Sequence, residues 1–333
     1  MAHIRPATPD DLDAVTRLLL ADAEARAARD PVLWRMHAQA KYKVRASVEV
    51  AIASDEPAFR QRWLVAETMG EGIVGVIHTI QLPVPPIYAG ASGPPGLIME
   101  DCALLPGAPP ALAVEMIAAA EADLREQGAR VLLASSVPGG PFELALAARG
   151  YEPLTLYLSK SGLSGADAAD VRRAVAEDVP AIVTLSADSR RVLHALDPFW
   201  APHPDAAARF GGWMEKSLIL PDRDMAVMEA GDGMTGYVIS QPVTPLHLPP
   251  AHETAGVGLI DDYHHRDLGD ATGAAGPGAA ALLAAAEADL AARGTVAALV
   301  VCPAAWGSKR AVIEGAGYTP ALVWRIASSS GAR

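Results

Sequence analysis

The sequence is poor in cysteine and in aromatic residues. Its two cysteines, Cys102 and Cys302, lie far apart and in no C-x-x-C pair, so neither a disulfide framework nor a thiolate metal site is expected. Aromatic residues make up only 5% of the chain. No apolar run reaches the roughly 18 residues that a membrane span needs, and no charged segment followed by an apolar one marks a secretory signal. We therefore expect a cytoplasmic protein with no membrane association.

Positive charge is also in short supply. The chain has 27 Lys and Arg against 39 Asp and Glu, which gives a formal net charge of -12 at pH 7. This charge repels nucleic-acid backbones, and no basic cluster is dense enough to offset it, so no nucleic-acid partner is expected. The acidic field suits a small cationic or amine substrate, although solubility alone accounts for it equally well.

An internal repeat dominates the remaining pattern. The chain has 333 residues, of which 51% are hydrophobic, enough for two cores. Short markers recur in the same order after 166 or 167 positions, which indicates a duplication. The pairs are Ile4-Arg5 with Val171-Arg172, Asp30-Pro31 with Asp197-Pro198, Ala118 to Leu124 with Ala284 to Leu290, and Gly150-Tyr151 with Gly317-Tyr318. We predict domains at residues 1–162 and 170–333, joined by a linker of small and polar residues at 163–169.

Each half predicts the element order βααβββαβαβ, in which the second early helix has no bounds set by the sequence. Capping residues, apolar runs and glycine stops set the expected bounds. In the first half these are strands at 3–7, 63–68, 73–81, 96–105, 131–136 and 155–159, and helices from 10 toward 28, at 111–127 and at 142–149. In the second half they are strands at 171–175, 225–229, 234–240, 258–263, 297–302 and 322–326, and helices at 179–193, 279–293 and 308–316.

Three motifs carry a resemblance to a known family. An apolar strand ends in an acidic pair in both halves, at Glu100-Asp101 and at Asp261-Asp262, and an Ala-rich helix follows. Each half then closes with a helix and a Gly-Tyr exit. Together these resemble a tandem member of the GCN5-related N-acetyltransferase (GNAT) family. The resemblance implies an α/β fold of two GNAT-like domains, each with a mixed, mostly antiparallel sheet flanked by helices. It also implies acetyl-CoA as cosubstrate, transfer of acetyl to an amine of a small molecule, and no metal.

The resemblance also implies where a cofactor would bind. The family holds a pyrophosphate on backbone N-H groups at the start of the helix after the acidic strand, with the fingerprint Q/R-x-x-G-x-G/A. The second half departs from the fingerprint but has glycines within one residue of it, whereas the first half has Ala108, Ala111 and Ala113 there, next to Pro109 and Pro110, and is interpreted as degenerate. The expected cofactor contacts are Tyr263, His264, His265, Gly273, Ala274, Gly276, Gly278, Ala279 and Lys309.

Catalysis would need few side chains. One member of the pair Asp261 and Asp262 should face the cleft and accept the amine's proton, and Glu100 and Asp101 hold the same places in the first half. His264 is a further candidate base. The tyrosine that the family commonly uses as an acid is replaced in both halves, by Leu146 and Ile313, which leaves Tyr318, Tyr151, Ser308 and Cys302 as nearby substitutes. Adjacent His264 and His265 point to opposite faces of a strand, so they do not predict a metal site.

Two functions from different classes remain open at this stage. The first is an N-acetyltransferase with an active second half. The second is a noncatalytic tandem that binds a small molecule or a protein, an alternative that the missing fingerprint and the missing tyrosine both favour. Aromatic residues after the first helix of each half, among them Trp34, Trp200 and Trp213, either line an acceptor pocket or form core. The chain is expected to be a monomer or a homodimer.

Overall fold

The computed structural model describes residues 2–53, 60–85, 87–91, 93–163, 170–231 and 233–327. Both halves have the predicted order of strands and helices. Among the described residues, none of the helices has the length and apolar character needed to cross a bilayer.

The first half begins with an edge strand and two helices, followed by the central strands. Its strands are β1 (His3–Pro6), β2 (Gln61–Thr68), β3 (Gly72–Gln81), β4 (Gly96–Ile98), β5 (Ala103–Leu104), β6 (Leu132–Ser136) and β7 (Tyr151–Ser161). Its helices are α1 (Leu12–Arg29), α2 (Ala40–Ala53), α3 (Pro110–Glu126) and α4 (Glu143–Ala148).

The second half repeats this order. Its strands are β8 (Val171–Arg173), β9 (Asp224–Ala230), β10 (Gly233–Pro242), β11 (Val257–His265), β12 (Ala297–Pro303) and β13 (Thr319–Ala327). Its helices are α5 (Val179–Leu196), α6 (Ala206–Ser217), α7 (Pro277–Ala292) and α8 (Gly307–Gly315).

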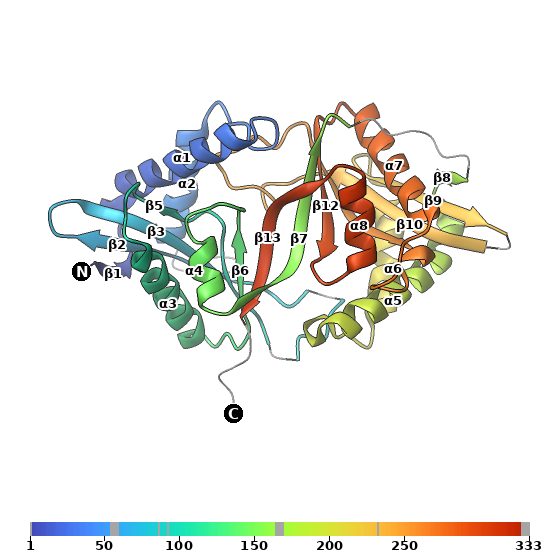
Figure 1. Ribbon diagram of the computed structural model, residues 1–333, viewed down its shortest axis with the longest axis horizontal. Helices are drawn as coiled ribbons and strands as arrows, with labels where there is room; N and C mark the ends of the chain where they lie inside the picture. Colours follow the sequence, from blue (N-terminus) through green and yellow to red (C-terminus); the bar gives the residue numbers. More distant parts are fainter. Residues whose placement is uncertain are drawn as a thin grey trace.

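All these strands join one 13-stranded sheet that runs through the whole molecule (Figure 1). Its order is β1-β2-β3-β4-β6-β13-β7-β12-β11-β10-β9-β8, with β5 paired to β3 off this path. Only two neighbouring pairs in this order are parallel, β4 with β6 and β11 with β12, and they hold equivalent places in the two halves. The predicted fold class, a mostly antiparallel mixed sheet flanked by helices, is confirmed.

The centre of the sheet is built by an exchange of strands. β13 from the second half lies between β6 and β7 of the first half, and β7 in turn pairs with β12 of the second half. In Figure 1 these two long strands run side by side through the middle of the molecule. The sequence did not predict this exchange, because the duplicated pattern specifies which strands form but not which copy each strand completes.

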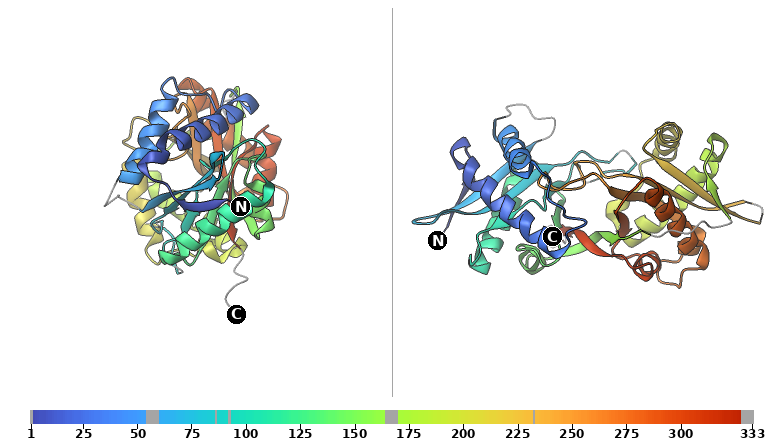
Figure 2. Two further views of the ribbon diagram at one scale, coloured as in Figure 1. Left: turned by 90° about the vertical axis from the view of Figure 1, so that its left-hand side faces the viewer. Right: turned by 90° about the horizontal axis from the view of Figure 1, so that it is seen from above.

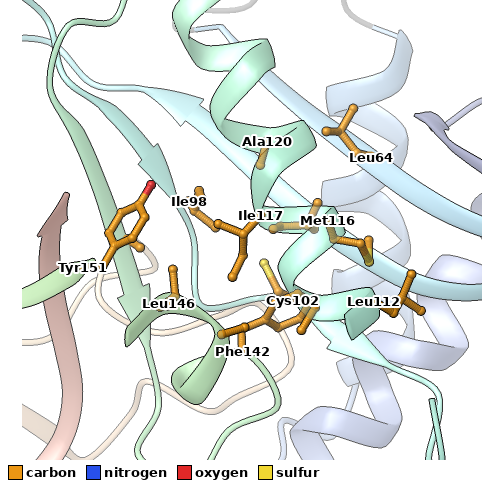
Figure 3. Close-up of a cluster of buried hydrophobic side chains, with 14 of the residues drawn as sticks. Leu64, Ile98, Cys102, Leu112, Met116, Ile117, Ala120, Phe142, Leu146 and Tyr151 are labelled. Carbon is orange, nitrogen blue, oxygen red and sulfur yellow. The ribbon is translucent and has the colours of Figure 1, made fainter. Parts of the chain in front are cut away.

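Helices cover both faces of the sheet (Figure 2). Side chains that alternate along the strands pack against these helices on opposite faces. In β2, Leu64 and Ala66 belong to the core under α3 and α4, whereas Trp63 and Val65 belong to the core under α1 and α2. Figure 3 shows part of the first of these cores, where Ile117 of α3 lies among buried side chains of the sheet and α4. The second half repeats both cores, with α7 and α8 on one face and α5 and α6 on the other.

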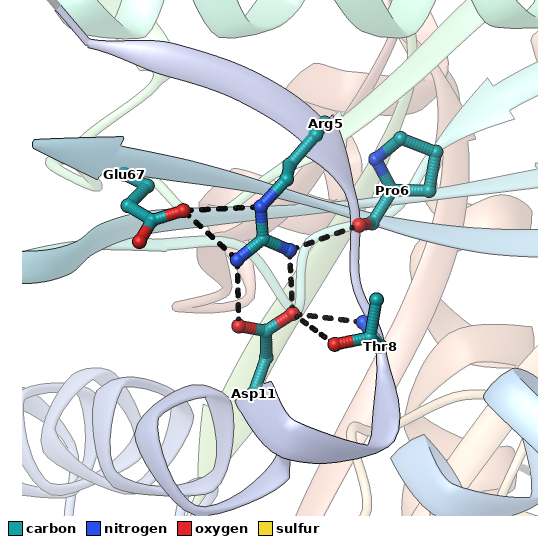
Figure 4. Close-up of polar contacts among 5 residues, drawn as sticks. All are labelled: Arg5, Pro6, Thr8, Asp11 and Glu67. Carbon is teal, nitrogen blue, oxygen red and sulfur yellow. Dashed lines mark hydrogen bonds and ion pairs between the residues drawn. The ribbon is translucent and has the colours of Figure 1, made fainter.

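A polar network recurs at the same place in both halves. Arg5 donates two hydrogen bonds to Asp11, at 2.6 and 2.9 Å, and two to Glu67, at 3.0 and 3.1 Å (Figure 4). Asp11 also accepts from the backbone N-H of Thr8, which fixes the entry to α1. In the second half, Arg172 donates two hydrogen bonds to Asp178 and one to Glu229, and Val175 replaces Thr8. This shared geometry supports the duplication independently of the sequence markers.

The strand predicted at 96–105 is interrupted in the structure. Residues 99–102 lie between β4 and β5, where the thiol of Cys102 donates to the carbonyl of Met99 at 3.0 Å. The backbone N-H of His78 in β3 bonds the same sulfur instead of a strand carbonyl. This local side-chain bonding replaces ladder hydrogen bonds, so the expectation of a continuous strand was wrong at these residues.

Candidate functional site

The candidate site lies where two parallel strands part. β11 pairs with β12 from Val257 to Ile260 and no further. Asp261 and Asp262 follow at once, so the two carboxylates stand at the opening between the strands. Asp262 accepts a hydrogen bond of 3.0 Å from the hydroxyl of Tyr237 in the neighbouring strand β10. This contact fixes the orientation of one member of the predicted acidic pair.

These carboxylates line a cavity of about 260 Å³. Helix α5 contributes Ser186, Ser189, Arg190 and Leu193 to its wall, and three tryptophans, Trp200, Trp213 and Trp306, supply aromatic surface. The first half also contributes to the wall, through Ile87 and Tyr88 of the loop after β3 and through Thr155 of β7. The cavity is therefore shared between the two halves of the chain.

The loop from the first half is held by backbone hydrogen bonds. Ala89 donates to the carbonyl of Ala201 at 2.7 Å, and His203 donates to the carbonyl of Ile87 at 3.0 Å. On the other side of the molecule, the segment around Met36 pairs with that around His252 in the same manner. A loop of each half thus pairs with the segment that follows the first long helix of the other half.

Burial sets the protonation of the acidic pair. It raises the pKa of Asp262 to about 6 and raises the pKa of Asp261, since an ionised carboxylate loses hydration inside the cavity. Burial also lowers the pKa of Lys309, whose ammonium group donates to the carbonyl of Tyr263 at 2.7 Å. An Asp carboxyl that titrates near pH 6 is able to exchange a proton under physiological conditions.

The start of α7 is already occupied by a carboxylate of the protein. The backbone N-H of Gly278 donates to Asp267 at 3.0 Å, and a Cβ placed on Gly276 would lie 2.4 Å from the same carboxylate. A Cβ on Gly278 would lie 2.4 Å from the ring of His265. These two glycines therefore leave room for Asp267 and His265, and the helix terminus has a negative group in place before any ligand arrives.

The rest of the predicted cofactor loop shows a similar arrangement. A Cβ on Gly273 would lie 2.8 Å from the carboxylate of Asp270, which also accepts from the N-H of Thr272. Ala274 is exposed, and Ala279 is fully buried with its carbonyl bonded by the hydroxyl of Tyr263. Two carboxylates of the protein, Asp267 and Asp270, therefore lie in this loop, and each accepts a backbone N-H group of it.

Side chains also fill the space beyond the parting strands. Trp306 is fully buried, and its indole N-H donates to the carbonyl of Leu268 at 2.9 Å. The ammonium group of Lys309 donates a hydrogen bond to the carbonyl of Tyr263, a main-chain group of β11 at this opening. Lys309 is almost completely buried, so it does not present its charge to a phosphate at the surface.

Acetyl-CoA therefore does not fit the described residues of the second half. Its phosphates would meet Asp267 and Asp270 at the start of α7. The first half offers no better place, because α3 begins at Pro110 directly after Pro109 and neither residue has an N-H. The hollow of about 220 Å³ beside it is lined by Glu71 and Glu115. In both halves the local charge opposes a pyrophosphate.

The other predicted catalytic residues lie apart from the cavity wall. His264 is buried against Trp306, and burial lowers its pKa to about 3, so it stays neutral. Tyr318 lies in the core under α7, where burial raises its pKa. Asp101 is bonded to His78 at 2.8 Å, and burial raises the pKa of Glu100. Among the described residues, no group of three His, Cys, Asp or Glu side chains could hold a metal ion.

Several wall residues were not predicted from the sequence. Arg190 and Ser186 lie one turn apart on α5, and their spacing of four residues was an available signal for a shared helix face. Tyr88 comes from a loop of the other half and gave no local signal. Trp200 and Trp213 were left open between pocket and core, and the structure places both on the cavity wall.

These features together define a duplicated α/β fold, with a pair of parallel strands in each half. No family model matches the sequence, and no curated protein matches it either. Among solved structures, a GCN5-related N-acetyltransferase from Sphaerobacter thermophilus matches with a TM-score of 0.58 at 14% identity, over 98% of this chain and 95% of that one. At this identity the likeness establishes the fold, and the chain has the GNAT fold in tandem.

Two further structures align along the chain. The GCN5-related glucosamine N-acetyltransferase region of a fungal multi-domain GH3 β-N-acetylglucosaminidase has a TM-score of 0.51 at 16% identity, over 98% of this chain and 37% of that one. A tandem GNAT protein from the clavulanic acid biosynthesis pathway covers 98% of this chain and 97% of that one at 16% identity, with a TM-score of 0.46 that is too low to support an inference.

Proposed function

We propose that the protein binds a small organic amine in the cavity that Asp261 and Asp262 line. The observation that carries this proposal is the pair Asp261 and Asp262 on one wall of a cavity that also has tryptophan surface. A carboxylate pairs with an ammonium group, and an aromatic face attracts it further. The overall negative charge of the chain favours the approach of such a ligand.

Calorimetric titration with phenylethylamine and putrescine at pH 5 and pH 8 tests this proposal. Binding should be tighter at pH 8, because Asp262, whose pKa is about 6, is then ionised. Asp262→Asn should weaken binding at pH 8 by about tenfold or more. Asp188→Asn, which removes a carboxylate of α5 outside the cavity wall, is the matched control and should bind as the parent does. The proposal is refuted if Asp262→Asn binds each amine as tightly as the parent does.

A second candidate function is transfer of acetyl from acetyl-CoA to the bound amine. The fold supports it, as does the pKa of Asp262 near the working pH of a general base. The carboxylates at the start of α7 and the filled strand opening favour binding without catalysis. Fold alone does not decide between the two functions.

Acetyl-CoA distinguishes the candidates. On the binding proposal, titration up to about 1 mM acetyl-CoA gives no heat of binding, which corresponds to an affinity weaker than about -4 kcal/mol. A thiol-detection assay with the bound amine then gives no release above the uncatalysed rate. Saturable release of thiol would replace the binding proposal by N-acetyl transfer.

A further inference from the structure

Helix α5 places one cation on the cavity wall without a carboxylate partner. Arg190 is buried, with 5% of its surface exposed. Its guanidinium donates to the hydroxyl of Ser186 at 2.6 Å and lies 5.6 Å from the centre of the Phe210 ring. No ion pair of Arg190 occurs in the part of the chain that the structure describes. Its direct partners are therefore a neutral oxygen and a ring. Burial raises the pKa of Asp262 and the charge of Arg190 opposes that rise, so the two groups interact through space although they form no ion pair.

The rest of the wall supplies the opposite charge at another place. Asp261 and Asp262 stand on β11, whereas Arg190 and Ser189 stand on α5, the helix that covers this part of the sheet. Lys309 is the other cation on the wall, and its ammonium group is already committed to the carbonyl of Tyr263. The cavity wall therefore carries an acidic pair on β11 and an arginine on α5 that is not bonded to it, with aromatic surface on the same wall.

We propose that the ligand is a zwitterion of amino-acid size, whose carboxylate binds Arg190 and whose ammonium group binds the Asp261 and Asp262 pair. This inference rests on the proposed amine-binding function and narrows its ligand class. Arginine matches a carboxylate with two parallel hydrogen bonds, which a lysine or a serine cannot do. The ligand's carboxylate supplies the directly bonded counter-charge that Arg190 lacks among the described residues, and the cavity of about 260 Å³ accommodates one such molecule.

The first half gives an internal control for this argument. Its buried arginine on the corresponding helix is Arg26, which aligns with Leu193 rather than with Arg190 and pairs with Asp22 four residues earlier, at 2.5 Å. Ser186 stands four residues before Arg190 and provides a hydroxyl instead. Ser186→Asp would therefore give Arg190 the partner that Arg26 has, while leaving the arginine itself in place.

The test is calorimetric titration of the full chain with each proteinogenic L-amino acid. The tightest binder is then compared with its decarboxylated amine and its deaminated acid. The amino acid should bind at least about thirtyfold more tightly than either analogue, because each analogue leaves one buried charge of the wall unpaired. Ser186→Asp and Arg190→Gln should both remove the preference for the amino acid over the amine. Arg191→Gln, an exposed neighbour bonded to Asp188, should retain it.

The possible results separate the two proposals. If the amine binds as tightly as the amino acid, the zwitterion inference is refuted and amine binding stands. If no amino acid and no amine binds at about 10 mM, both proposals are refuted. If Arg190→Gln fails to fold, Ser186→Asp still decides, since a folded variant with unchanged preference for the amino acid would contradict the role of Arg190.

Discussion

The same four positions of the first long helix line a cavity in each half, but with different residues. In the first half they are Leu19, Asp22, Ala23 and Arg26, and in the second half Ser186, Ser189, Arg190 and Leu193. The first cavity has a volume of about 20 Å³, against about 260 Å³ for the second. In the first half, the ion pair between Asp22 and Arg26 fills this place. In the second half, the small side chains of Ser186 and Ser189 leave it open. After duplication, one copy of this surface has closed on itself and the other has kept room for a ligand.

The opening between the parallel strands is filled by a large side chain in the second half but not in the first. Removing that side chain should have the largest effect of the changes proposed here. Trp306 is fully buried there, while Gly139 holds the corresponding position of the first half. Trp306→Ala should lower the free energy of unfolding by about 4 kcal/mol, because it leaves a large void and an unpaired carbonyl. Urea denaturation measures the loss. Leu144→Ala, at an exposed position of α4, should change stability by less than about 0.5 kcal/mol.

The second prediction concerns the pH dependence of stability. Burial raises the pKa of Asp262 from its ordinary value of 3.8 to about 6 in the folded chain, so the folded state holds its proton over a wider pH range. Stability from this group is therefore present at low pH and is lost as pH rises through 6, by roughly 3 kcal/mol. Asp262→Asn should remove that loss. The measurement is the difference in unfolding free energy between variant and parent at each pH from 4 to 7. His264, whose pKa is lowered by burial, contributes equally to both proteins, so its pH dependence cancels in this difference.

A third prediction concerns the arginine–aspartate network that the two halves share. Asp11 and Asp178 accept the same pair of arginine hydrogen bonds, and the arginine lowers the pKa of each carboxyl. Asp11→Ala and Asp178→Ala should each cost about 2 kcal/mol, less than a fully buried ion pair because the arginines are partly exposed. Thermal and urea unfolding compare the two. Costs that differ by more than about 1 kcal/mol would contradict the equivalence of the networks.

The smallest effect is expected at the start of α7. Asp267→Ala removes the carboxylate that accepts from Gly278, at a cost of about 1 kcal/mol. Acetyl-CoA should still not bind, because Trp306 and Lys309 continue to fill the strand opening. Scanning calorimetry of this variant measures the loss of stability, and titration calorimetry with acetyl-CoA measures binding. Binding of acetyl-CoA by Asp267→Ala would show that a single carboxylate had excluded it.

The sequence predicted the fold more fully than the site. Periodicity and glycine stops located both sets of strands and helices, since local propensity and one buried face decide them. The acidic pair Asp261 and Asp262 was found because it follows an apolar strand directly. The role of Gly276 and Gly278 was not predictable, because a glycine-rich loop makes room equally for a phosphate or for a carboxylate of the protein. The acidic residues that fill this room, Asp267 and Asp270, were visible a few residues earlier.

Residues from the other half escaped prediction for a different reason. Tyr88 reaches the cavity through a loop that pairs with the segment after α5, more than 100 positions away. No local pattern specifies such a contact. Arg190 was overlooked because its significance depends on a partner that is missing, and a missing partner becomes apparent only when the surrounding side chains have been placed.

The exchange of β7 and β13 ties these differences together. A half of the chain made alone would leave β6 or β12 as a bare edge and its own last strand without a neighbour. Two separate halves would have to meet in solution, so their melting temperature would rise with concentration by mass action. Joining them in one polypeptide makes the association unimolecular. The two copies are then free to diverge in sequence while each remains the obligatory scaffold of the other.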